Sequence, residues 1–290
     1  MTLVWRPDYN GTPGKVTLRG PTVAPLLLDS YSGAAAAYSL RQLSWAYGGP
    51  VVRVRRSSDN TESDFTATEV SDGTLAAWVG AGNNGFVRTW YDQSSNGNNA
   101  TQSTAETQPT IVSNGALVTE GGQPAISFNV DVLQRIGNSL SFPVFTFSVV
   151  KSTANGIRAY LGSGSNQLAF GQQPAGSFAP VNSFWAWAPS QASTFGLLNS
   201  YNTNRNLHSY WIPNATESEW KWYLNSVESG SPGLTSGAPT GASLTFVGYS
   251  GADYEYWQGP IQEILIYQTD QSANRAAIEA NINAHYSIYP

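Results

Sequence analysis

The chain has 290 residues, of which only 11% are charged and 12% are aromatic; its formal net charge is −5 and its pI is near 5.0. This balance supplies no basic patch for a phosphate backbone, which counts against a nucleic-acid partner. The absence of cysteine excludes a disulfide framework, a thiolate metal site and a cysteine nucleophile. No window approaches eighteen apolar residues, and residues 1–8 lack the features of an export signal, so neither membrane insertion nor export is expected.

The first predicted elements are an extended arm and a helix. Residues 1–25 contain four prolines and three glycines, which disfavour a helix and suggest a docking segment. Residues 34–47 place apolar side chains at an i, i+4, i+7, i+11 spacing, with Asp29, Ser30 or Ser32 as N-cap, so a helix is predicted there. The same reasoning predicts a short helix capped by Asp72 and a closing helix over residues 272–285.

Many short strands are predicted between the helices. They cover residues 51–56, 86–91, 111–112, 125–128, 145–151, 160–161, 168–170, 196–198, 209–212, 220–224, 244–248 and 261–267. The arginines of 51–56 alternate with valines and are expected on a solvated face, and Asn225-Ser226 is expected to form a two-residue hairpin turn. No repeat or linker divides the chain, so one all-β domain is predicted over residues 26–290, with residues 129–138 as the alternative boundary.

Polar residues follow the strand predicted at 86–91. In one interpretation, the side chains from Asp92 to Asn99 bond the backbone of their own turn. In the other, Asp92 and Asn96 contact a sugar, or join Asn98 as ligands of Ca²⁺. These residues lack the full spacing of a known oxygen-ligand loop, and no cofactor is expected.

Three blocks of sequence resemble a known family. They are residues 26–41, Arg53–Asp59 and Thr89–Ala100, and in this order they resemble the catalytic domain of family-B α-L-arabinofuranosidases. Tyr160–Gly162 and Trp257–Tyr286 match more loosely. The resemblance implies a concanavalin A-like jelly-roll β-sandwich. The blocks also look like LamG-like jelly-roll proteins of tailed bacteriophages, which similarly have no cysteine, no export signal and a short N-terminal arm.

A glycosidase needs two carboxyl groups that flank the bond it cleaves. The resemblance implies a glutamate nucleophile just before Tyr160. In this chain residues 156–159 occupy that place, and none of them is Asp or Glu. Indeed, no Asp or Glu lies between Asp131 and Glu217, and the family's pair of adjacent cysteines is also missing. No catalytic residue is therefore assigned. If the chain is an enzyme, the resemblance gives Asp253 as the approximate acid position, with Glu255 and Asp92 as the other candidate carboxylates.

Aromatic side chains suggest carbohydrate binding, because they stack on the apolar faces of sugars. Trp220 and Trp222 share one face of a predicted strand and are expected in the core. The predicted sugar-binding residues are Trp185, Trp187, Tyr254, Tyr256, Asp92 and Asn96.

The resemblance and the missing glutamate together predict a non-catalytic exterior virion protein of a tailed bacteriophage. It would be a tail fibre, a baseplate adhesin or a head decoration, made in the host cytoplasm and attached to other virion proteins through residues 1–25. Host surface polysaccharide is the expected ligand, and a homo-oligomer, such as a trimer, is expected. The alternative is a glycoside hydrolase of the arabinofuranosidase type that acts on surface polysaccharide.

Overall fold

A computed structural model describes most of the chain. The described residues are 24–135, 140–154, 158–162, 168–173, 183–187, 204–214, 216, 219–229, 244–249 and 256–290, without the side chains of 172, 173 and 183–187. Of the predicted arm, only residues 24 and 25 are described, and the strand predicted at 196–198 lies outside the described residues.

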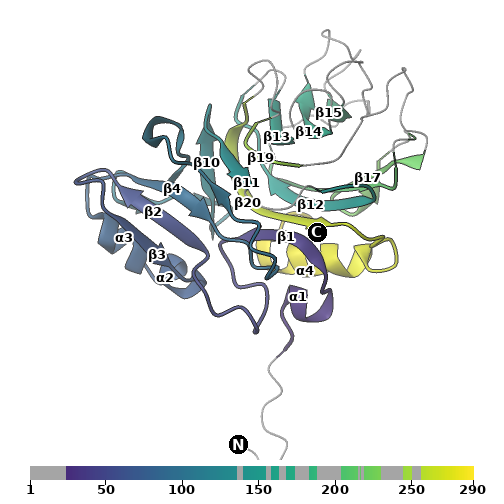
Figure 1. Ribbon diagram of the computed structural model, residues 1–290, viewed down its shortest axis with the longest axis horizontal. Coiled ribbons are helices and arrows are strands. Elements are labelled where there is room, and N and C mark those ends of the chain that lie inside the picture. The colour runs from purple at the N-terminus through teal and green to yellow at the C-terminus, as the bar shows by residue number, and fades with distance from the viewer. Residues whose placement is uncertain are drawn as a thin grey trace, which may run out of the picture.

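Short strands dominate the element order, and the longest helix is near the C-terminus (Figure 1). The helices are α1 (Leu27–Ser30), α2 (Ala67–Ser71), α3 (Thr74–Val79) and α4 (Arg275–Tyr286), with the 3-10 helix η1 (Ala105–Thr107). The strands are β1 (Ala34–Ser39), β2 (Val52–Arg56), β3 (Glu62–Phe65), β4 (Gly85–Trp90), β5 (Ala100–Thr101), β6 (Thr110–Ser113), β7 (Ala116–Leu117), β8 (Thr119–Glu120), β9 (Gln123–Pro124), β10 (Ile126–Asn129), β11 (Leu133–Arg135), β12 (Val144–Val150), β13 (Arg158–Gly162), β14 (Ala169–Gln173), β15 (Ser183–Trp187), β16 (Asn206–Ile212), β17 (Lys221–Leu224), β18 (Val227–Glu228), β19 (Phe246–Val247) and β20 (Gln258–Tyr267).

The strands pair into two antiparallel sheets. The first sheet has the order β1–β20–β12–β16–β17–β18. The second has the order β3–β2–β4–β5–β11–β19–β13–β14–β15. The two sheets are joined by β10 and β6, because β10 pairs with both β20 and β6, and β6 pairs with β4. The predicted all-β sandwich is confirmed.

Two hydrophobic clusters hold this arrangement together. The inner cluster fills the space between the sheets and includes Tyr38, Trp90, Trp222, Trp257 and Ile264. The outer cluster lies between the first sheet and α4, and includes Phe145, Phe147, Leu265, Ile278 and Ile282. Strand alternation produces the division, since successive side chains of β12 and β20 point to opposite faces of the sheet. Helix α4 therefore covers the outer face of the first sheet (Figure 1).

The helix predicted over residues 34–47 is wrong. Strand β1 occupies Ala34–Ser39 and pairs with β20 from Ala34↔Tyr267 to Ser39↔Glu263. Ala36 belongs to the inner cluster and Ala37 to the outer cluster, and both are fully buried. The alanines are thus small side chains required on both faces of a central strand, and this packing outweighs their helix propensity.

Other predicted elements are confirmed. The short helix predicted after Asp72 is α3, but its N-cap is Gly73; Asp72, one residue earlier, accepts a hydrogen bond of 2.9 Å from the Thr74 backbone N–H. Helix α4 occupies most of the predicted closing helix. Asn225 and Ser226 have φ values of 50° and 69°, as a type I′ hairpin turn between β17 and β18 requires. Helix α2 was not predicted. Among the described residues, no helix has the length and apolar character needed to cross a membrane.

Candidate functional site

The turn that follows β4 is a structural element built around Asp92. The Asp92 carboxylate is 3% exposed. Its Oδ1 accepts hydrogen bonds from the backbone N–H groups of Ala37 and Ser94, and its Oδ2 accepts from the Asn98 N–H and the Ser94 hydroxyl. Both oxygens are therefore used to fix this turn against β1, and a role of Asp92 in sugar contact or catalysis remains a prediction.

The neighbouring asparagines also bond to the protein. Asn96 donates from Nδ2 to the Ala34 carbonyl at 2.9 Å, and Asn98 donates from Nδ2 to the Ala35 carbonyl at 2.7 Å. Asn98 Oδ1 accepts from the guanidinium of Arg135 at 3.1 Å. A guanidinium bound to a candidate ligand oxygen repels a metal cation, so the placement gives no support to Ca²⁺ at these residues. No group of three His, Cys, Asp or Glu side chains suited to a metal occurs in the described part of the chain.

The predicted aromatic sites fall in different places. Trp220 and Trp222 are 2% and 0% exposed, which confirms their assignment to the core. Tyr256 is partly buried and stacks on Tyr249 with 4.3 Å between ring centroids. Five other predicted site residues fall outside what the structure describes: Asp253, Tyr254 and Glu255 entirely, and Trp185 and Trp187 of β15 by their side chains.

The inner face of the sandwich carries a set of polar and aromatic side chains that were not predicted. We call Thr146, Ser148, Tyr160, His208, Tyr210 and Trp222 the inner-face cluster; all six are buried. Ser148 faces His208 and Thr146 faces Tyr210 across the β12–β16 pair. The rings of His208 and Trp222 stack with centroids 5.9 Å apart, and Tyr160 of β13 lies 6.0 Å from His208.

The inner-face cluster is electrically neutral. Burial raises the pKa of Tyr160 and of Tyr210, and lowers the pKa of His208 to about 3, so all three are uncharged at neutral pH. The hydroxyl groups of Tyr160, Tyr210 and Ser148 interact with one another, although none of them, nor that of Thr146, makes a hydrogen bond of strict geometry to another described residue. The cluster is therefore a neutral polar patch inside the core.

A strained turn between β10 and β11 carries a partly buried carboxyl group. Val130, between β10 and β11, has φ of 67°, which a β-branched residue rarely adopts, and its side chain is 49% exposed. Asp131 follows, and its Oδ2 accepts from the Asn129 N–H at 2.8 Å. Burial raises the pKa of Asp131 to about 6. This value suits a group that donates a proton under mildly acidic conditions.

Gly248 links the Asp131 turn to the inner-face cluster. A Cβ on Gly248 would lie 2.8 Å from the Asp131 carbonyl oxygen, so the two backbones are in contact. The Gly248 N–H donates to the Tyr160 carbonyl, and its own carbonyl accepts from the Trp257 N–H, both at 2.8 Å. The Trp257 ring lies 5.5 Å from Tyr160 in an edge-to-face contact. Asp131 thus sits where β11, β13, β19 and the start of β20 meet.

Sequence reasoning missed Asp131 although a signal was present. Asp131 is the last carboxylate before a stretch without Asp or Glu that ends at Glu217, and this isolation marks it in the sequence. The alternation of Thr146 and Ser148 with phenylalanine and valine along β12 would have indicated one hydroxyl-bearing face.

Solved structures share the fold of the chain. An arabinofuranosidase in complex with arabinofuranosyl-α-1,2-xylobiose matches with a TM-score of 0.64 and 17% identity, over 89% of this chain and 64% of that one. A GH54 α-L-arabinofuranosidase soaked with a cyclic sulfate inhibitor matches with a TM-score of 0.66 and 15% identity, over 91% and 65%. The chain therefore spans less than two thirds of these two proteins. No curated protein matches the chain.

A family model decides between the two resemblances. The model described as the catalytic domain of α-L-arabinofuranosidase B matches residues 29–183, just over half of the 290 residues. The expectation of a non-catalytic virion protein of a tailed bacteriophage is wrong, because the family that matches is one of arabinofuranosidase catalytic domains. That expectation gave too much weight to one missing glutamate. The chain belongs to the family of α-L-arabinofuranosidase B catalytic domains.

Proposed function

We propose that the protein is a glycoside hydrolase of the arabinofuranosidase type that removes arabinofuranose units from a polysaccharide. The observation that carries this proposal is membership of a catalytic-domain family over residues 29–183. The carboxyl group of Asp131 supports it, since burial raises its pKa to about 6, a value that suits a general acid.

In this proposal, the sugar binds beside the turn that carries Asp131, and Asp131 donates a proton to the departing oxygen. Asp131 is positioned for this by the contact of its backbone with Gly248, which is hydrogen-bonded to Tyr160. General acid catalysis by a positioned carboxyl contributes about 10²–10⁴-fold to a rate. The second carboxylate of the pair is Asp253 or Glu255, in the segment flanked by the stacked Tyr249 and Tyr256.

This assignment replaces the glutamate that the family resemblance places before Tyr160. Residues 156–159 contain no acid, so a carboxylate at that place of β13 takes no part in the reaction. Loops at the end of a sandwich can bring a carboxylate to the same bond from another strand, because a site is defined by its geometry and not by its position in the sequence.

The test uses the purified full chain with 4-nitrophenyl α-L-arabinofuranoside and with arabinoxylan. We expect release of nitrophenol and of free arabinose. Asp131→Asn should lower kcat about 10²–10⁴-fold and remove the limb of the pH profile near pH 6. Asp253→Asn and Glu255→Gln identify the second carboxylate, because one of them should lower kcat comparably.

A matched control is Asp72→Asn, since Asp72 is exposed and the asparagine can still accept from Thr74. This variant should keep the wild-type rate. A wild-type chain that releases neither nitrophenol nor arabinose would overturn the proposed function. If the wild type is active and the Asp131→Asn variant keeps full activity, the proposed hydrolase function holds, but the general acid is a residue other than Asp131.

A further inference from the structure

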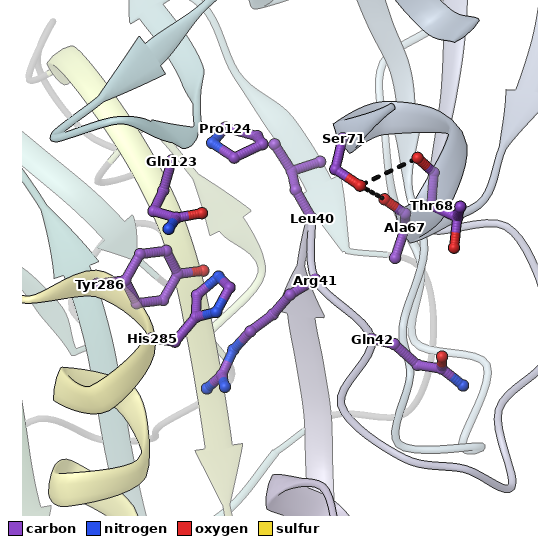
Figure 2. A pocket seen from close by; sticks show the side chains of 10 residues that line it. All are labelled: Leu40, Arg41, Gln42, Ala67, Thr68, Ser71, Gln123, Pro124, His285 and Tyr286. Atoms are coloured by element: carbon purple, nitrogen blue, oxygen red, sulfur yellow. Dashed lines mark hydrogen bonds between the residues drawn. The ribbon is translucent and has the colours of Figure 1, made fainter. Parts of the chain in front are cut away.

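A cleft outside the sandwich interior has the character of a second binding site. It is lined by residues that follow β1, by α2, by β9 and by the end of α4, and Figure 2 shows their side chains converging from these four elements. Its volume is about 210 Å³, and a second hollow of about 220 Å³ adjoins it through the shared lining residues Gln42, Ala67 and Thr68. No residue of the inner-face cluster lines either hollow. We call this feature the α2–α4 cleft.

The charged residues around the α2–α4 cleft neutralise one another. Arg41 donates from Nε and Nη2 to the two carboxylate oxygens of Glu263 at 2.8 and 2.9 Å, and from Nη1 to Asn281 Oδ1 at 3.1 Å. Burial and the positive charge of Arg41 lower the pKa of His285, against the opposing effect of Glu263, so His285 is neutral at pH 7. A ligand with a net charge would find no free counter-charge among the described residues of this cleft.

Several hydrogen-bonding groups remain available in the α2–α4 cleft. The side-chain amide of Gln123, the hydroxyl of Thr68 and the imidazole of His285 make no hydrogen bond to another described residue. Gln42 donates from Nε2 to the carbonyls of Ser44 and Tyr47, both at 2.9 Å, which fixes the orientation of its amide. The cleft therefore offers a ligand neutral hydrogen-bond donors and acceptors, and the amide of Gln42 is held in a fixed orientation.

Apolar surfaces complete the lining. Leu40, Pro124 and the ring of Tyr286 are apolar parts of the lining and are labelled in Figure 2. The adjoining hollow is lined at one end by Tyr47, Gly48 and Gly49; a Cβ on Gly48 would meet no atom within 4 Å, whereas one on Gly49 would lie 3.2 Å from the Tyr47 ring. Small apolar walls combined with neutral polar groups are the surroundings that bind a sugar ring, which has apolar C–H faces and hydroxyl edges.

We infer that the α2–α4 cleft is a second carbohydrate-binding site, which takes one or two uncharged sugar units and is separate from the inner face of the sandwich. Such a site would hold the protein on a polysaccharide while another part of the same polymer is bound elsewhere, and the two sites together would raise the apparent affinity through a high effective concentration. The inference does not depend on hydrolysis, because it concerns different residues.

The test measures binding of xylotriose, a neutral probe, and of trigalacturonate, an acidic probe of the same length, by titration calorimetry and saturation-transfer NMR on the full chain. We expect xylotriose to bind in the millimolar range and trigalacturonate to bind at least tenfold more weakly. Ser71→Trp, which fills the cleft from the end of α2, should weaken xylotriose binding at least tenfold. Gln123→Ala should weaken it several-fold, and because the Gln123 side chain bonds to no described residue, this variant should fold normally.

The matched control is Thr74→Trp, since Thr74 is exposed at the start of α3 and lines neither hollow. Its binding should equal that of the wild type. Xylotriose binding that is unchanged in both Ser71→Trp and Gln123→Ala would overturn the inference, as would equal binding of trigalacturonate or no binding by the wild type. If the wild-type chain binds xylotriose at this cleft but hydrolyses no arabinofuranoside, only the proposed function is contradicted.

Discussion

At the residue scale, the buried pair of Arg41 and Glu263 illustrates how a charge is stabilised inside this sandwich. Glu263 is fully buried and accepts hydrogen bonds from Arg41, Ser39 and Tyr286. Burial by itself raises a carboxyl pKa, but the guanidinium of Arg41 and the Ser39 hydroxyl bring the pKa of Glu263 below its ordinary 4.5. The carboxylate therefore contributes stability above pH 4.5, and this contribution is lost as the pH falls through the folded-state pKa.

Glu263→Gln tests this pair. At pH 7 the substitution leaves Arg41 without a counter-charge, and we expect the free energy of unfolding to fall by about 3–5 kcal/mol. The difference from wild type should shrink as the pH is lowered below 4.5, which urea denaturation at several pH values measures. Glu62→Gln is the control, because Glu62 makes only a partly exposed ion pair with Arg88 at 3.6 Å and should change stability by about 0–1 kcal/mol. Equal losses in the two variants would contradict the argument.

Asp92 allows a structural role to be separated from a ligand role. Its carboxylate accepts four hydrogen bonds in a buried turn, so Asp92→Ala should cost at least about 2 kcal/mol of stability, since each unsatisfied buried donor costs about 1–3 kcal/mol. The fraction that remains folded should bind and turn over sugar like the wild type. A variant with normal stability and lost sugar binding would instead assign Asp92 to a ligand site.

At the element scale, local patterns predicted hairpin turns and alternating strands such as β2, but not the alanine-rich strand β1. Asn225-Ser226 and the alternation of Val52 and Val54 with arginines depend only on neighbouring residues, so the sequence was sufficient for them. Strand β1 was mistaken for a helix because its alanines are chosen by packing on both faces, a constraint that comes from β20 more than 220 residues later in the chain. Such long-range pairing leaves no local signal.

The candidate site could be predicted only in part for the same reason. Asp131, Gly248 and Tyr160 are far apart in the sequence, and they meet because β11, β19 and β13 pair side by side. Short blocks of sequence were enough to show the resemblance to a catalytic domain. They could not show that Asp131 lies near Tyr160, because that neighbourhood depends on the pairing of distant strands.

Gly248→Ala tests the junction of β19 with the Asp131 turn. The residue has φ of +84°, and its Cβ would collide with the Phe128 ring and approach the Asp131 carbonyl to 2.8 Å. Gly73→Ala is the control, because Gly73 has φ of +94° with no atom within 4 Å of the new Cβ. The control should lose about 1–2 kcal/mol from strain alone, and Gly248→Ala should lose clearly more and also alter the pKa of Asp131 measured by NMR. If both variants lose the same free energy of unfolding, the close approach of Gly248 to Phe128 and to the Asp131 carbonyl is absent.

At the scale of the whole molecule, β20 carries both hydrophobic clusters. Ile264 points into the inner cluster, whereas Leu265 belongs to the outer cluster under α4. Because one strand supports both clusters, neither can melt without disturbing the other. The two sides of the sheet nevertheless differ, since the inner face bears the inner-face cluster, whereas the outer face combines apolar packing against α4 with the buried hydrogen bond between Tyr286 and Glu263.

Ile264→Ala and Ile278→Ala test this division. Both side chains are fully buried, so each substitution should lower the free energy of unfolding by about 2–5 kcal/mol. The two losses should be additive within about 0.5 kcal/mol, because the sheet separates the two sites. Unfolding should remain a single transition by both fluorescence and circular dichroism. Ile278→Ala should leave kcat unchanged, since Ile278 lies on α4, on the opposite side of the sheet from Tyr210 and His208. Two separate transitions, with only one shifted by Ile278→Ala, would mean that α4 and the sandwich fold independently.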